Sequence, residues 1–191
     1  MNLPNGLTVA RLILGPIILA CLIAGEVRLC LYLFLVAMFT DLYDGYLARI
    51  SDSVTEFGKL MDPLADKVLV SLSLIGFLLL GVPYVSVWMV VAIVGRELLI
   101  LGWRTGAVKS GDGFVTSRVA KWKTASQMAW VALVLLHLTI LSRIGIAPTA
   151  ANDSVAGTFL WAFGLAAVIL TLVSGVEYVL SGRHTAEGAS S

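Results

Sequence analysis

Charged residues are scarce in this chain. Only 13% of its 191 residues are Asp, Glu, Lys or Arg, whereas 59% are hydrophobic, and the mean hydropathy is +0.95. Soluble domains carry about 25% charged residues, so this composition excludes an ordinary soluble protein. A bilayer core about 30 Å thick requires roughly 20 apolar residues per helix. We therefore expect an all-α integral membrane protein.

Cysteine is also rare, with only Cys21 and Cys30 in the chain. Two cysteines at unrelated positions form neither a metal-binding nor a redox pattern, so we interpret them as small apolar packing residues. No internal repeat relates the two halves of the chain. This weakens the case for a secondary transporter, because such proteins are often built from repeated halves.

Six apolar stretches have the length of membrane-spanning helices, near residues 7–25, 29–48, 62–81, 83–103, 124–141 and 155–180. They leave no room for a separate soluble domain. We predict one membrane domain over residues 1–182, with a short interfacial segment at its start and a disordered tail at 183–191. The first stretch is interpreted as a retained helix rather than a cleaved signal. Short connections at 26–29 and 81–83 predict that the flanking helices are antiparallel neighbours.

The thirteen basic residues are distributed unevenly between the two sides of the predicted membrane domain. If the N-terminus is cytoplasmic, ten of them lie on or near the cytoplasmic side. Only Arg28 and Arg143 then lie on the outer side, and Arg96 lies inside a span. Basic residues favour the cytoplasmic side of membrane proteins. We therefore expect a multi-pass protein of the cell (inner) membrane with both termini in the cytoplasm.

The carboxylates, in contrast, are concentrated, since six of the twelve lie between residues 41 and 66. Asp41 and Asp44 are three residues apart and Asp62 and Asp66 are four apart, so each pair shares one face of a helix. One helix approaches the cytoplasm and the next leaves it, so the two pairs can face each other. Four carboxylates this close need compensating charge. Oxygen ligands suit Mg²⁺ or Mn²⁺, and we predict two divalent cations, which suit a phosphoryl displacement.

Small residues lie beside these aspartates. Gly45, Ala48 and Gly58 have small side chains or none, so a nucleotide could approach the backbone closely at these positions. This close approach would explain why a glycine is kept inside a helix, where it lowers helix stability. The alternative is that the acidic residues only solvate a loop, and we adopt it for Asp52 and Glu56. It does not suit the aspartates that end a long apolar run, because acidic groups at that depth are functional candidates.

These residues also carry a family resemblance. The stretches DLYDGYLAR (41–49) and GKLMDPLAD (58–66) resemble the complete signature of the CDP-alcohol phosphotransferases, and the expected six helices resemble that family over the whole chain. The resemblance implies that an alcohol attacks the lipid-side phosphorus of a CDP-linked lipid and that CMP leaves. It also implies that all four aspartates are metal ligands and that Asp66 is, in addition, the general base.

The resemblance extends to contacts with the CDP-lipid. The segment LPNGLTVAR (3–11) resembles the N-terminal segment that helps to wall the nucleotide pocket in this family. Asn5 could equally cap a helix, and Arg11 could extend to lipid phosphates. Arginine can donate to a pyrophosphate, which suits Arg49. The positions assigned to the CDP-lipid by resemblance are Pro4, Asn5, Thr8, Gly45, Arg49 and Thr55.

The connection over 104–123 holds five basic residues and one acid, Asp112. Such a cluster suits a phosphorylated acceptor, although ordinary attraction to anionic headgroups is an alternative. The stretches GRELLI (95–100) and RVAKWKTASQM (118–128) are similar to the branch of the family that makes phosphatidylglycerol phosphate. That similarity implies CDP-diacylglycerol as donor and sn-glycerol 3-phosphate as acceptor. The predicted contacts to the acceptor phosphate are Arg104, Arg118, Lys121 and Lys123.

Several expectations complete this interpretation. Arg96 and Glu97 point about 100° apart on a helix and need not pair. The five tryptophans are interpreted mostly as interfacial anchors, and His137 as a packing residue or a satisfied polar contact. Alternative functions are the same chemistry with another acceptor, such as inositol phosphate, and a divalent-cation transporter. Family members are commonly homodimers, so we expect a homodimer in the lipid bilayer, with no nucleic-acid partner.

Overall fold

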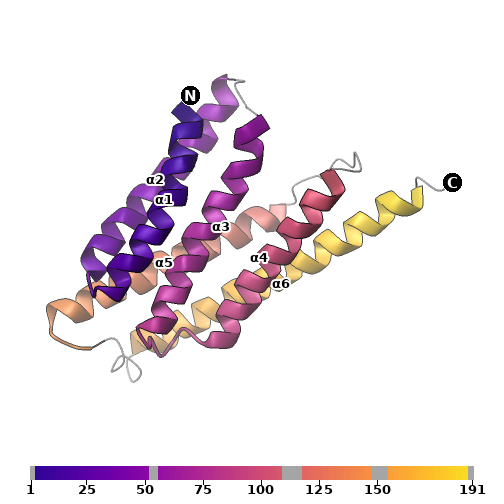
Figure 1. Cartoon of the computed structure of the whole chain (residues 1–191). Coiled ribbons are helices and arrows are strands. Elements are labelled where there is room, and N and C mark those ends of the chain that lie inside the picture. Colours follow the sequence, from indigo (N-terminus) through magenta and orange to yellow (C-terminus); the bar gives the residue numbers. More distant parts are fainter. Residues whose placement is uncertain (1–2, 52–55, 109–117, 148–154, 189–191) are drawn as a thin grey trace.

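The structure is a computed structural model that describes residues 3–51, 56–108, 118–147 and 155–188, and the side chains within 9–41, 64–65, 67–102, 122–147 and 155–178. Every secondary-structure element in these ranges is a helix, which confirms the all-α prediction. Figure 1 shows the helices as an elongated bundle. They are α1 (Leu3–Ile23), α2 (Val27–Ser51), α3 (Glu56–Leu79), α4 (Val87–Val108), α5 (Arg118–Arg143) and α6 (Val155–Gly188).

Two of the turns between helices are closed by glycine. Gly25 has φ of 78° and Gly81 has φ of 66°, a left-handed conformation that other residues adopt at a cost. At the end of α1, Glu26 N–H donates to the Cys21 carbonyl over 2.9 Å, and Val82 N–H donates to Phe77 over 3.1 Å in the same way after α3. The chain therefore reverses within a few residues. The predicted antiparallel neighbours, α1 with α2 and α3 with α4, are confirmed by their contacts.

Helix α1 lies between the two helices that carry the predicted metal ligands. It contacts both α2 and α3, whereas α2 and α3 do not contact each other within the described residues. The approach of α1 to α3 is close, because a Cβ added to Gly76 of α3 would collide with the Leu22 side chain of α1. The absence of a side chain at Gly76 thus sets how near the two helices can lie.

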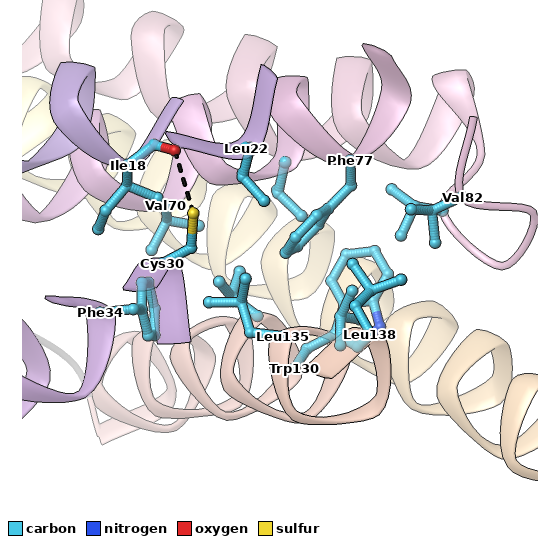
Figure 2. Packing of buried hydrophobic residues seen from close by; sticks show 14 of the residues in the cluster. Ile18, Leu22, Cys30, Phe34, Val70, Phe77, Val82, Trp130, Leu135 and Leu138 are labelled. Carbon is cyan, nitrogen blue, oxygen red and sulfur yellow. Dashed lines mark hydrogen bonds between the residues drawn. The ribbon is translucent and has the colours of Figure 1, made fainter. Parts of the chain in front are cut away.

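An apolar core runs through the bundle and is shown in Figure 2. Its fully buried members include Phe34 of α2, Phe77 of α3 and Leu135 of α5. Cys30 packs in this core, and its thiol lies 3.5 Å from the carbonyl of Ile18. This agrees with the interpretation of Cys30 as a packing residue.

The outer surface of the bundle is also rich in apolar side chains. Large hydrophobic residues that are more than half exposed include Phe39 of α2, Val91 of α4 and Ile169 of α6. Exposed apolar surface on this scale suits a lipid environment rather than water. Within the described residues, Trp122–Arg143 and Val155–Tyr178 are long and apolar enough to cross a bilayer, while Val9–Ile23 and Lys67–Leu79 form shorter apolar helices. The six spans therefore stay a prediction.

The structure differs from two further expectations, which concern the tryptophans and the C-terminal tail. Trp88, Trp122 and Trp161 are substantially exposed, but Trp130 is fully buried, so its assignment as an interfacial anchor is wrong. Its indole N–H instead donates to the carbonyl of Leu160 over 2.9 Å. Residues 183–191 are expected to form a disordered tail, but α6 continues to Gly188, so residues 183–188 are helical.

Candidate active site

The four predicted aspartate ligands lie in two helices, α2 and α3, and near the same end of the bundle. Asp41 and Asp44 are in the C-terminal half of α2, and Asp62 and Asp66 are in the N-terminal half of α3. The short segment 52–55 separates α2 from α3, so these halves lie at the same end, where α1 also begins. The backbone therefore brings the two pairs to the same end of the molecule, as the sequence predicts.

Asp41 is the one predicted ligand whose side chain the structure describes. Its carboxylate forms an ion pair with the guanidinium of Arg11, which comes from α1. The Arg11 side chain is only 2% exposed, whereas that of Asp41 is 27% exposed. Burial of a charge is costly unless it is paired, which explains why Arg11 is directed at a carboxylate. The alternative that Arg11 extends to lipid phosphates is wrong for this structure.

The remaining predicted ligands, Asp44, Asp62 and Asp66, lie in helices, but their side chains are outside the described set. Among the side chains that are described, no group of three or more His, Cys, Asp or Glu could hold a metal ion. The donor set still fits a hard divalent cation, because four aspartates supply only oxygen ligands. Asp41 also shows that a carboxylate at this end of the bundle takes a cationic partner.

The residues assigned to the CDP-lipid gather at the same end as the aspartates. Their side chains also lie outside the described set, so only their positions along the helices are available. Pro4, Asn5 and Thr8 are in the first turns of α1, Gly45, Ala48 and Arg49 are in the last turns of α2, and Gly58 is in the first turn of α3. Thr55 is outside the described residues.

The residues predicted to contact the acceptor phosphate lie near the ends of two other helices. Arg104 is near the end of α4, and Arg118 and Lys121 are in the first turn of α5, all without described side chains. Lys123 is described, and its side chain is only 6% exposed. Its ammonium group forms a short ion pair with Glu97 of α4 rather than lying at an open surface.

Glu97 is the centre of a buried ionic cluster that the sequence analysis missed. Besides Lys123, it is paired with Lys67 of α3, whose Nζ lies 3.3 Å from Oε2, and with Arg96, whose Nη1 lies 3.1 Å from Oε1. Arg96 and Glu97 therefore do pair, although adjacent helix residues need not. A carboxylate within the apolar run of α4 was the available signal, because such a group requires partners.

Polar contacts continue from this cluster into α6. Arg96 Nη2 donates to Ser174 Oγ over 2.9 Å, and Gln127 Nε2 donates to Thr171 Oγ1 over 2.8 Å. The cluster and these two contacts form a buried polar layer that joins α3, α4, α5 and α6. At the other end of the bundle, the Tyr84 hydroxyl lies 2.9 Å from His137 Nδ1, which confirms a satisfied polar contact for the histidine.

Sequence comparison identifies a family and several relatives of this chain. A family model described as CDP-alcohol phosphatidyltransferase matches residues 1–176. The chain is 35% identical over 192 residues to a Bacillus subtilis protein named CDP-diacylglycerol–glycerol-3-phosphate 3-phosphatidyltransferase, covering 93% of each chain. It is 36% identical to a Rickettsia felis protein of the same name, again over 93% of each, and 31% identical to one from Cereibacter sphaeroides, over 76% of this chain and 70% of that protein.

Proposed function

Since the chain belongs to the CDP-alcohol phosphatidyltransferase family, we propose that it transfers the phosphatidyl group of CDP-diacylglycerol to sn-glycerol 3-phosphate. The products are phosphatidylglycerol phosphate and CMP. The observation that carries the proposal is the pair of stretches DLYDGYLAR and GKLMDPLAD, which supply four aspartates from α2 and α3 at one end of the bundle. Two relatives that match over 93% of this chain bear the name of this reaction.

The chain's own residues have separate roles in this reaction. The acceptor hydroxyl oxygen forms a bond to the lipid-side phosphorus, and the bond from that phosphorus to the CMP oxygen breaks. Asp66 accepts the proton of the attacking hydroxyl, since a carboxylate within reach can act as a general base. Arg49 donates to the pyrophosphate, a contact for which a guanidinium is well shaped. Gly45, Ala48 and Gly58 allow the nucleotide to approach the backbone.

A divalent cation belongs to this proposal because the family uses one, and the aspartates provide its ligands. Asp41, Asp44, Asp62 and Asp66 would hold two ions, Mg²⁺ or Mn²⁺, which when bound would neutralise negative charge on the phosphates in the transition state. Arg11 is paired with Asp41 in the present structure. This ion pair keeps the Asp41 carboxylate compensated, and it must loosen if Asp41 is to contribute fully to a metal site.

The acceptor is proposed to bind on the basic side of the site. Arg104, Arg118, Lys121 and Lys123 lie near the end of α4 and the start of α5. A phosphomonoester carries nearly two negative charges at neutral pH, so several cations favour it over an uncharged alcohol. The lipid chains enter from the bilayer, while the soluble acceptor arrives from the cytoplasm.

The proposal includes the setting of the enzyme. We infer a multi-pass protein of the inner membrane, with the active site and both termini in the cytoplasm, from the distribution of basic residues. The exposed apolar side chains of the bundle support contact with lipid. We propose a homodimer only because members of this family are commonly homodimers.

The test is an acceptor-resolved assay with purified protein. CDP-diacylglycerol, Mg²⁺ and one acceptor at a time are incubated, and both CMP and the lipid product are measured. We expect release with glycerol 3-phosphate, and a loss of at least about 100-fold in Asp66→Asn, the scale of general-base catalysis. Asp52→Asn, from the same stretch but outside the two motifs, is the matched control and should retain activity.

Two outcomes would replace this proposal. Release with inositol phosphate, but not with glycerol 3-phosphate, would keep the chemistry and change the acceptor. Flux of divalent cations into liposomes without any lipid product would indicate a transporter instead.

A further inference from the structure

The buried cluster around Glu97 has an unusual charge balance. Three cations, from Lys67, Arg96 and Lys123, surround one carboxylate in the described structure, so the cluster carries a net charge of about +2. Each of these side chains is mostly buried, with exposed fractions of 22%, 11% and 6%. Like charges in a poorly solvated place repel each other strongly. The carboxylate of Glu97 is what allows the three cations to lie together.

Two partners of Glu97 come from helices with different proposed roles in the reaction. Lys67 directly follows Asp66, the proposed general base in α3, and Lys123 is in α5 with the proposed acceptor contacts Arg118 and Lys121. Glu97 is in α4 and contacts both lysines. In addition, Lys67 Nζ donates to the backbone carbonyl of Glu97 over 3.3 Å, and this hydrogen bond holds α3 against α4 at Glu97.

Direct contacts between α3 and α5 are few among the described residues. The contacts of α3 with α5 are sparse compared with those of α3 with α1 or of α5 with α6. The bridge Lys67–Glu97–Lys123 is therefore a polar connection between the helix of the proposed base and the helix of the proposed acceptor contacts, in addition to the apolar core. The Arg96 contact with Ser174 holds the middle of this bridge against α6.

We propose that Glu97 is a positioning residue, which holds Lys123 for the acceptor phosphate and aligns α5 with the Asp66 segment of α3. This inference rests on the proposed function, because it assigns the acceptor to α5. Without the carboxylate, Lys67 and Lys123 repel each other and the Lys123 ammonium leaves its present place. The contacts of the CDP-lipid lie in α1, α2 and the start of α3, where Glu97 has no described contact, so they are affected less.

The experiment compares the two substrates in Glu97→Gln. We expect KM for glycerol 3-phosphate to rise by about tenfold or more, since one contact to a charged group contributes a factor of this order. KM for CDP-diacylglycerol should stay within about twofold, well below the change from such a contact. Glu97→Asp keeps the charge and should recover part of the acceptor affinity. Glu26→Gln, an exposed glutamate between α1 and α2, is the control and should change neither KM.

A purely structural role predicts a different pattern. Loss of folded protein lowers the rate per total protein but does not change the KM of either substrate. Unchanged KM values in Glu97→Gln, or equal changes in both, would therefore overturn the proposal. If Glu97→Gln does not fold, Lys67→Met combined with Glu97→Gln removes one charge of each sign, keeps the net charge at about +2 and provides the same readout.

The same assay separates this inference from the proposed function. If the wild-type protein uses glycerol 3-phosphate and only the selective KM change is absent, the role of Glu97 is wrong and the function stands. If the wild-type protein uses a different phosphorylated alcohol, the proposed acceptor is wrong, and the KM comparison is made with that alcohol.

Discussion

The ion pair between Arg11 and Asp41 predicts that protein stability and metal binding are linked. In Arg11→Met the methionine preserves much of the apolar contact of the stem, but Asp41 loses its buried cationic partner. Removal of one partner of a buried pair costs about 3–5 kcal/mol. Because the Asp41 side chain is 27% exposed, water compensates part of this loss, and we expect about 3 kcal/mol, the lower end of that range. For a chain of this size this corresponds to a decrease in Tm of roughly 6–12 °C.

A divalent cation at the aspartates should offset part of this loss. An ion that binds only the folded protein adds about 2.7 kcal/mol at 100 times its Kd. If the proposed ion binds at Asp41, it competes there with Arg11 in the wild-type protein, and Arg11→Met removes this competition. The increase in Tm on addition of Mg²⁺ should therefore be larger in Arg11→Met than in the wild-type protein.

Thermal unfolding in detergent, followed by tryptophan fluorescence at one scan rate, measures this difference. Each protein is heated in EDTA and in Mg²⁺. Arg28→Met removes an exposed arginine near the start of α2 and is the matched control, with a Tm within about 2 °C of the wild-type value, as for most surface substitutions. Equal Mg²⁺-induced shifts in the wild-type protein and Arg11→Met would refute competition for Asp41. An unchanged Tm of Arg11→Met in EDTA would refute the stabilising role of the pair.

Three further predictions concern packing, the polar layer and the metal. Gly164→Ala should destabilise the protein by about 1–3 kcal/mol, because the new Cβ would overlap the ring of Trp130; Gly102→Ala, with open space at that position, is the control, and equal Tm values would contradict the packing argument. Gln127→Leu leaves the Thr171 hydroxyl without this partner and should lower stability by about 1 kcal/mol in denaturant titration, while an unchanged midpoint would show that the contact contributes nothing. EDTA should abolish CMP release and excess Mg²⁺ or Mn²⁺ should restore it, so activity that persists in EDTA would contradict the metal assignment.

Local features of this fold can be predicted well from the sequence. The tight connections after α1 and α3 are evident from short interruptions of the apolar runs at 26–29 and 81–83, and Gly25 and Gly81 have positive φ there. The sequence likewise predicts that Asp41 and Asp44 lie in one helix and Asp62 and Asp66 in the next, at the same end of the molecule, and the backbone agrees. These features depend on neighbours within a few residues, and a single chain displays such neighbours directly.

Partners that are distant in sequence could not be predicted in this way. The pairing of Arg11 with Asp41 and of Glu97 with Lys67 and Lys123 depends on how the helices rotate and pack. Hydrophobic periodicity gives little guidance here, because lipid-facing and core-facing sides are both apolar. The buried position of Trp130 was missed for the same reason, since the space for its indole comes from Gly164 in another helix.

The position of α1 has a consequence for variants far from the aspartates. Because α1 separates α2 from α3, its thickness determines the distance between the two helices that carry the carboxylates. A bulkier side chain at Gly76 would push α3 away from α1 and so increase the distance between the aspartate pairs of α2 and α3. Substitutions along this apolar seam could therefore impair turnover while every acidic and basic residue remains in place.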